Sequence, residues 1–317
     1  MKLIPKILFG MRQFGFNKTL RLLYKISRKV KIIKKLSEVI RSDLDPKNLS
    51  KLPSSNLTFC RGVFGERQKV NLNDHIGWRF FLDGYFELET PLLAKMMYKD
   101  GLIKEYIDIG AHIGLELIPI ALGGIKSIGF EPSHQTYSNL LANIELNKLK
   151  NVRTYNLGAF SSNTKKVLYT SSLNHGASSI HQNWHDSSVL TDEATIDLVR
   201  LDSINEINID NALLKIDVEG AESSVLDGLG ESLKFNPILI FEFYKDKNNI
   251  LDLPHVKNYL KNNYNFKTVL ADLVGKNQIE LSLIDFDFSC SKPSVIGVPN
   301  NFKSWLDSQD KRILNLR

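Results

Sequence analysis

The stretch EYIDIGAHIG at residues 105–114 decides the fold. It begins with an apolar run that is typical of a buried strand, and Gly110 and Gly114 follow where the chain turns into a helical segment. Open α/β sheets bind ligands in the crevice outside the carboxyl ends of their strands. The stretch therefore predicts a ligand-binding loop over residues 108–114, although a tight strand-to-helix turn without a ligand would need the same glycines.

Further strands and helices alternate along the chain on the carboxyl side of this loop. The strand-like runs are SIGFEP (127–132), VRTYNLGAF (152–160), ALLKIDVEG (212–220) and PILIFEFY (237–244). Helical patterns begin at Pro132-Ser133 and cover residues 220–233. This alternation predicts an α/β fold with a doubly wound, mostly parallel sheet. Pro119 should kink or shorten the first helix because it has no N–H.

The two ends of this region are expected to differ from its centre. Residues 57–100 mix short strands with a helix. Three further strand-like segments follow the parallel region, FKTVLAD (266–272), IELSLIDFDF (279–288) and SVIGVPN (294–300). They are close enough in sequence to include an antiparallel hairpin at the edge of the sheet.

Glu131, at the end of the second strand, indicates an adenosine cofactor. It lies 23 residues beyond Asp108, where an acid can accept hydrogen bonds from the two ribose hydroxyls. NAD and S-adenosyl-L-methionine (SAM) both fit this frame. Asp108 would repel the pyrophosphate of NAD, and the GxGxxG spacing of a dehydrogenase is absent. The sulfonium and ammonium of SAM favour nearby carboxylates, so we expect SAM, with Asp108, Gly110 and Gly114 at its methionine end.

The fourth strand delivers Lys215, Asp217, Glu219 and Glu222 to the same edge of the sheet. This acidic cluster could bind a substrate, supply a base or hold a metal. Glu222 alternatively favours only the first turn of its helix, and Lys215 alternatively neutralises a neighbour. A magnesium ion at Asp217, Glu219 and Glu242 has no supporting motif, and we predict no metal.

Asp217 is the preferred proton acceptor because it lies at the strand end. His175, in the segment SSLNHGASSI (171–180), is the alternative because histidine titrates near neutrality, although a surface or hydrogen-bonding histidine is more common. His181 and His185 are four residues apart and could share a helical face. Neither a cysteine nor a known motif accompanies them, so a metal site there is not expected.

Charge is distributed unevenly along the 317 residues. Residues 1–41 hold twelve Lys and Arg and one acid, Glu38, so a chain of net charge +6 leaves −5 on its other 276 residues. Apolar residues recur at helical spacing at Leu22, Ile26, Val30, Ile33, Leu36 and Ile40. This pattern predicts a basic amphipathic helix that packs on the body or another subunit, binds an anionic membrane, or contacts nucleic acid. The acidic remainder disfavours nucleic acid.

Composition divides the chain into three regions and suggests a location. We expect a basic helical extension over 1–45, a linker and cap over 46–80, and a catalytic domain over 81–317. No apolar stretch approaches the roughly 20 residues that span a bilayer. Cys60 and Cys290 show no metal or disulfide spacing. These features predict a cytoplasmic protein, with peripheral membrane contact through residues 1–41 as an option.

Together the motifs resemble the FkbM family of methyltransferases. The resemblance rests on DIGAHIG (108–114), FEP (130–132), the helix pattern L-xx-NI-xx-N at Leu140, Asn143, Ile144 and Asn147, and KIDVEGAE (215–222). It implies a class I SAM-dependent fold over about residues 80–300, and usually O-methylation of a sugar, surface glycan or secondary metabolite. His112, a further cofactor-binding candidate, stands where the family usually has Asn.

Two other functions stay open at this point. A non-catalytic SAM-binding scaffold, attached to a membrane or partner through the basic extension, predicts SAM binding without turnover. An NAD-dependent oxidoreductase predicts NAD binding without SAM binding. The methyl acceptor, a small molecule or glycan, is expected to bind against residues 57–100 and 161–195.

Overall fold

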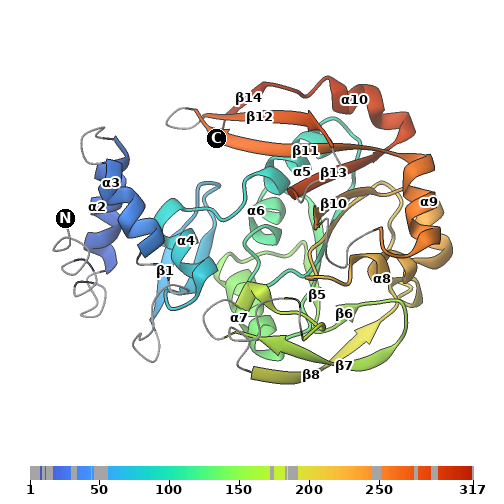
Figure 1. The fold of residues 1–317 in the computed structure, drawn as a ribbon, viewed down its shortest axis with the longest axis horizontal. Coiled ribbons are helices and arrows are strands. Elements are labelled where there is room, and N and C mark those ends of the chain that lie inside the picture. Colours follow the sequence, from blue (N-terminus) through green and yellow to red (C-terminus); the bar gives the residue numbers. More distant parts are fainter. Residues whose placement is uncertain are drawn as a thin grey trace.

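A nine-stranded mixed sheet, with strand order β14-β12-β11-β13-β10-β9-β3-β4-β5, lies at the centre of the protein (Figure 1). The computed structural model describes residues 8, 11, 17–29, 34–43, 45, 56–171, 175–182, 184, 192–244, 251–274, 278–286 and 292–315. The parallel strands are β5 (Val152–Tyr155), β4 (Lys126–Phe130), β3 (Glu105–Ile109), β9 (Ala212–Ile216) and β10 (Ile238–Phe243). The chain runs from β3 outward through β4 and β5, then returns to the other side of β3. The predicted doubly wound sheet is confirmed.

Both faces of β3 and β9, at the centre of the sheet, are buried, and most of their side chains are apolar. The covering helices are α5 (Glu89–Lys99), α6 (Leu117–Leu122), α7 (His134–Leu146), α8 (Glu222–Asp227) and α9 (Pro254–Asn263). On β3, Ile107 and Ile109 join the core under α8 and α9, whereas Tyr106 joins the core under α5 and α6. Successive strand residues point to opposite faces, which produces these two cores.

Antiparallel strands complete one edge of the sheet. They are β13 (Lys292–Pro299), β11 (Tyr264–Leu273), β12 (Gln278–Asp285) and β14 (Arg312–Asn315). β11 and β12 form the predicted hairpin, and β13 inserts between β10 and β11. Helix α10 (Lys303–Asp307) and the short η7 turn (Asn300–Phe302) link β13 to β14.

Three predicted elements are shorter than expected. The first helix begins only at Leu117, so Pro119 lies in its first turn, where a missing N–H costs little. The helix expected over 220–233 splits into α8 and a 3-10 segment, η6 (Gly230–Phe235), because Gly228 lies against the Phe160 carbonyl and Gly230 has a positive φ. The strand expected over 152–160 divides into β5 and β6 (Gly158–Ala159), which belong to different sheets.

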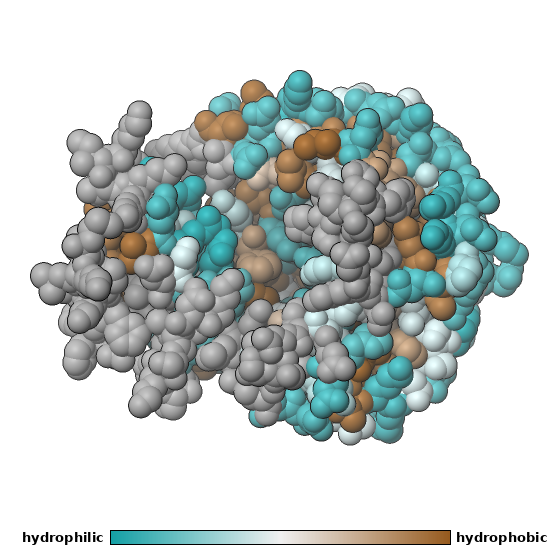
Figure 2. Space-filling view, in the orientation of Figure 1, coloured by the Kyte–Doolittle hydropathy of each residue, from teal (hydrophilic) through white to brown (hydrophobic). Residues whose placement is uncertain are grey.

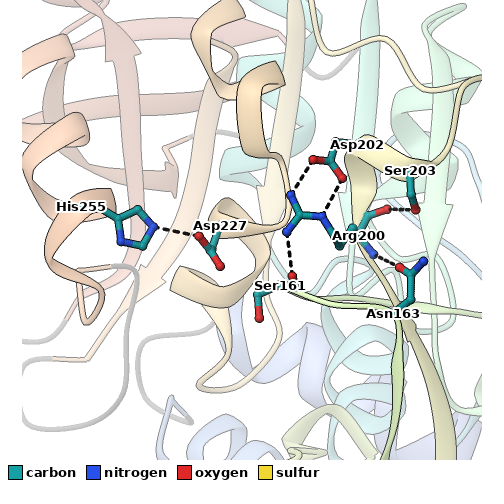
Figure 3. Close-up of polar contacts among 7 residues, drawn as sticks. All are labelled: Ser161, Asn163, Arg200, Asp202, Ser203, Asp227 and His255. Atoms are coloured by element: carbon teal, nitrogen blue, oxygen red, sulfur yellow. Dashed lines mark hydrogen bonds and ion pairs between the residues drawn. The ribbon is translucent and has the colours of Figure 1, made fainter.

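The second sheet has the order β6-β8-β7 and adjoins the main sheet where β5 ends (Figure 1). Its longer strands are β7 (Thr164–Thr170) and β8 (Asp192–Val199). Arg200 ties its end to the body: its guanidinium donates to both Asp202 oxygens at 2.9 and 2.6 Å and to the Ser161 carbonyl at 2.8 Å (Figure 3). The Arg200 N–H also donates to the Asn163 side chain. This clamp fixes the turn that enters η5 (Leu201–Ser203).

The motif asparagines of α7 hold a small N-terminal hairpin, β1 (Leu57–Arg61) and β2 (Arg67–Asn71). Asn143 Oδ1 accepts from the Lys69 N–H at 2.7 Å, and Asn147 Oδ1 accepts from the Arg67 N–H at 2.8 Å. Their amide groups donate back to the carbonyls of the same two residues. Each side chain thus replaces a strand partner for the edge of β2.

The described part of the basic extension contains two α-helices that contact each other. Helix α2 (Asn17–Lys29) contacts α3 (Lys34–Glu38), which continues into the π-helical turn η2 (Val39–Asp43). Helix α2 also contacts α4 (His75–Asp83), which crosses the expected boundary at residue 80. Only some residues of the predicted apolar stripe are buried against the protein body.

The burial of α2 differs from the prediction at several positions. Leu20 and Tyr24 are buried, whereas Leu22 and Ile26 are exposed. Val30 and Ile33 lie outside the described residues. Among the described residues, no helix is both long and apolar enough to cross a bilayer. Hydrophilic side chains dominate the right-hand rim of the face drawn in Figure 2.

Candidate functional site

A cavity of about 280 Å³ opens at the carboxyl edge of the parallel strands. Its walls include Gly110 after β3, Glu131 after β4, Asp217 after β9 and Glu242 in β10. The edge lies where the chain order reverses between β3 and β9, which is the ligand-binding position of doubly wound sheets. The strand ends predicted from the sequence are thus brought to one cavity.

Three residues with positive φ shape the loop after β3, namely Gly110, His112 and Gly114. Gly110 has φ of 96°, and a Cβ atom there would lie 1.9 Å from the Asp217 carbonyl oxygen. Glycine is therefore required for the close approach of β3 and β9. His112 has φ of 49°, a conformation that glycine and asparagine adopt most easily and histidine tolerates. The backbone of His112 thus keeps the shape that an asparagine would have there.

Glu131 organises this loop while facing the cavity. Its carboxylate accepts from the His112 N–H at 3.0 Å and from the Ser133 N–H at 2.8 Å. Burial raises the pKa of Glu131 to about 7, against the lowering effect of these two hydrogen bonds. Each carboxylate oxygen can accept a further hydrogen bond. Glu131 can therefore hold the loop and still receive hydroxyl donors from a ribose.

Asp108 and Gly114 support the loop and do not line the cavity. Asp108 shares the Tyr106 face of β3, and burial raises its pKa to about 7 although Lys215 favours the charged form. The Gly114 carbonyl accepts from Gln68 Nε2 at 3.1 Å, and a Cβ atom at Gly114 would meet Leu140 and Ile118. The structure gives both residues a packing role beneath the loop.

Lys215 lies in a buried ion network with Glu116 and Asp217. Its ammonium contacts Glu116 Oε2 and lies 3.0 Å from Asp217 Oδ2. Burial lowers the pKa of Lys215, but the surrounding carboxylates outweigh it and raise the pKa well above its usual value. The alternative in which Lys215 neutralises its neighbours is thus the arrangement observed. Lys215 also lines the cavity.

Asp217, Glu219 and Glu242 come together across the ends of β9 and β10. One carboxylate oxygen from each lies within 4.8 Å of the others. Trp184 Nε1 donates to Glu219 at 2.6 Å, and the Tyr244 hydroxyl donates to Glu242. Burial, followed by the charge of Asp217, raises the pKa of Glu242 to about 8. Oxygens this close could receive a cation or a divalent metal ion.

The remaining sequence candidates lie in different settings. Glu222 begins α8, is buried, and accepts from the Gly220 N–H at 3.1 Å, which fits a first-turn role. His175 lies in the short η4 turn (His175–Ala177), whose Gly176 lines the cavity, but its side chain lies outside the described residues. His185 also lies outside them, so the histidine pair has no structural description.

Sequence reasoning missed three side chains of the site. Glu87, between α4 and α5, lines the cavity, and burial followed by Glu116 raises its pKa well above the usual value. Glu116 lies just before α6, outside every motif. Tyr244, which also lines the cavity, follows Glu242 by two residues, and the strand-end rule could have identified it. No local signal marks Glu87 or Glu116.

Solved structures that are similar to this chain include three complexes with SAH, AdoMet or SAM. The Bacillus cereus O-methyltransferase in complex with SAH is 11% identical to this chain and has a TM-score of 0.36, and the match covers 66% of this chain and 80% of the O-methyltransferase. The M. jannaschii TYW2 complex with AdoMet has 14% identity, 78% and 88% coverage, and a TM-score of 0.37. The Streptomyces achromogenes O-methyltransferase TomG in complex with SAM has 8% identity, 66% and 78% coverage, and a TM-score of 0.34.

Comparison with protein families identifies the chain more directly. No curated protein matches it. The family model of the methyltransferase FkbM domain matches residues 108–268, about half of the chain. This region begins at the loop after β3 and extends into β11, so it contains the strand ends that form the cavity. The chain belongs to the FkbM methyltransferase family.

Proposed function

We propose that the protein transfers the methyl group of SAM to a hydroxyl oxygen of a sugar, surface glycan or secondary metabolite. The observation that carries the proposal is the cavity in which the Gly110 turn and Glu131 meet the acidic ends of β9 and β10. Family membership supports methyl transfer as the reaction. The choice of an oxygen acceptor rests on the resemblance of the motifs.

The residues at the loop end of the cavity fit SAM. The missing Cβ of Gly110 leaves a backbone surface that a ligand can approach closely. Glu131 offers carboxylate oxygens to the ribose hydroxyls. Asp217 and Glu242 favour the sulfonium and ammonium groups of SAM, whereas they would repel the pyrophosphate of NAD. Lys215, the one lysine among the described lining residues, is already engaged by Glu116 and Asp217.

The acidic end of the cavity supplies the groups that methylation of a hydroxyl needs. SAM brings an electrophilic methyl group on a sulfonium. The protein must hold the acceptor oxygen in line with it and remove the hydroxyl proton. We assign Asp217 to this position because Lys215 fixes one of its oxygens at 3.0 Å and the other can accept a proton. Glu242, whose pKa of about 8 lies near neutrality, and His175 are the alternatives.

A calorimetric titration with S-adenosylhomocysteine tests the cofactor assignment. Wild-type protein is expected to bind in the micromolar range, and Glu131→Ala is expected to weaken binding by roughly tenfold or more because the ribose loses its acceptor. Glu145→Ala, an exposed change on α7, is the matched control and should bind as wild type. Glu131→Gln keeps the shape of the side chain and covers the case in which the alanine variant unfolds.

The outcomes separate the competing functions. Binding of NAD without S-adenosylhomocysteine would refute the proposal in favour of an oxidoreductase. Binding of S-adenosylhomocysteine without methyl transfer to any offered sugar or hydroxylated metabolite would favour the non-catalytic scaffold. A loss of methyl transfer in Asp217→Asn that is much larger than the loss of S-adenosylhomocysteine binding would support the assignment of the base.

A further inference from the structure

We propose that the exposed face of α2 docks the protein onto an anionic lipid surface. The exposed-face residues are Lys18, Leu22, Lys25 and Ile26, which lie on one side of the helix because they are spaced by three and four positions. Leu22 is 58% exposed and Ile26 is 45% exposed, although both are aliphatic. Both lysines that flank them are exposed as well.

The opposite side of α2 shows that this exposure is a property of the packed helix. Leu20 is fully buried and Tyr24 is 2% exposed, and both join a core with Trp78 and Phe81 of α4. The Tyr24 hydroxyl donates to Asp83 Oδ1 at 2.6 Å. The helix therefore has a fixed orientation in which Leu22 and Ile26 face outward. Helices that lie in a membrane interface typically have aliphatic side chains flanked by lysines, as this face of α2 does.

Charge selects the kind of surface that this face fits. Residues 1–41 carry twelve basic residues and one acid, whereas the rest of the chain has a net charge of −5. Three of these twelve basic residues lie in the segment before α2, residues 1–16, which contains no acid. An anionic membrane attracts the basic residues and receives the aliphatic side chains. The phosphates of nucleic acid would also attract the basic residues, but they offer no apolar environment for Leu22 and Ile26.

Helix α4 connects this face to the cavity. Asp83, at its last turn, binds Tyr24 and lies 3.0 Å from the Arg28 guanidinium. His75, at its first turn, lines the cavity and pairs with Asp45 at 2.7 Å. The nine residues of α4 span about 13 Å. Docking through α2 would place a membrane at the end of the molecule where α2 and α3 lie, with α4 between them and the main sheet (Figure 1).

Cosedimentation of the full chain with vesicles tests the proposal. The protein is expected to bind vesicles that mix phosphatidylcholine with phosphatidylglycerol roughly tenfold or more better than vesicles of phosphatidylcholine alone, and to be released by salt. The double variant Leu22→Gln/Ile26→Gln should lose most of this binding. Leu141→Gln/Ile313→Gln, a control at exposed aliphatic positions on α7 and β14, should bind as wild type.

A fluorescence measurement provides a second readout that does not depend on loss of binding. With Cys290 replaced by serine, an environment-sensitive dye on Leu22→Cys should shift to the blue with the anionic vesicles, whereas the same dye on Leu141→Cys should not. Equal binding to both vesicle types, or equal loss in the control double variant, would overturn the proposal. Preferential binding of a DNA duplex would overturn it in favour of nucleic acid. Self-association that Leu22→Gln/Ile26→Gln abolishes, without vesicle binding, would overturn it in favour of a second copy of the chain.

Discussion

Replacing Lys215 by methionine should destabilise the protein by leaving two carboxylates without their shared cation. The Lys215 side chain is 9% exposed, and its partners Glu116 and Asp217 are 7% and 27% exposed. Removing one partner of a buried ion pair costs about 3–5 kcal/mol. Because Asp217 is partly hydrated, we expect the lower end, about 3 kcal/mol near neutral pH.

Because the stability of Lys215→Met is lost through unpaired carboxylates, a second substitution should restore stability, and the loss should depend on pH. In Lys215→Met/Glu116→Gln, the second substitution removes one of the stranded charges, so most of the lost stability should return. Burial raises the pKa values of Asp108 and Glu87 against the lowering effect of Lys215, so the loss of Lys215 should raise the values of both carboxylates further above those of the unfolded state. Their protonation then favours folding, so the deficit of Lys215→Met should shrink as pH falls and grow as pH rises.

Urea unfolding followed by far-UV circular dichroism, at about pH 5.5 and about pH 7.5, measures these differences. Lys234→Met is the matched control, because Lys234 forms an exposed ion pair with Glu231. Its loss should cost no more than about 0.5 kcal/mol. A loss under about 1 kcal/mol for Lys215→Met, or no recovery in the double variant, would refute the description of Lys215 as the centre of a buried network.

Three further predictions concern single residues. Burial raises the pKa of Glu222 to about 8 from 4.5, so the protein should lose stability as pH rises between these two values. Glu222→Gln should therefore show a weaker dependence of Tm on pH than the wild type, and parallel curves for the two proteins would contradict this prediction. Gly110→Ala should lower the free energy of unfolding by about 2 kcal/mol or more and weaken S-adenosylhomocysteine binding, because the new Cβ would clash with the Asp217 carbonyl in a residue with positive φ. Unchanged unfolding and titration curves would contradict this prediction and show that the loop can move. Burial raises the pKa of Cys60 to about 12, so a Cys290→Ser variant should react with a thiol reagent only after unfolding, and rapid reaction of the native variant would contradict the burial.

The sequence identified the parts of the site that follow directly from buried strands. Apolar runs in a parallel sheet are recognisable, and the residue after each run must lie at the ligand-binding edge. This argument located Gly110, Glu131 and Asp217 in one cavity. Asp108 shares the face of Tyr106 under α6 because a strand alternates its side chains, and its assignment to the methionine end of SAM stays a prediction.

Residues that depend on tertiary packing could not be found in this way. Glu87 enters the cavity from a segment that precedes the first parallel strand, and only the packing of α4 against the domain brings it there. The outward face of α2 was hidden for a similar reason. Leu20 and Tyr24, with Leu22 and Ile26, form two apolar groups on one helix, and the sequence does not show which group meets the body.

The two opposite charge regions of the chain have a joint consequence for the proposed reaction. An anionic lipid surface attracts the basic extension and repels the acidic body, so the two together would orient the docked protein with α2 toward the lipid. Helix α4 links α2 to the cavity, because Asp83 at one end accepts a hydrogen bond from Tyr24 and His75 at the other end lines the cavity. His75 packs edge-on against Phe86, next to Glu87 at the acidic end of the cavity. A docked methyltransferase of this form would therefore reach acceptors presented at the membrane more readily than acceptors in solution, and vesicle-linked and free forms of one hydroxylated acceptor would differ in kcat/KM.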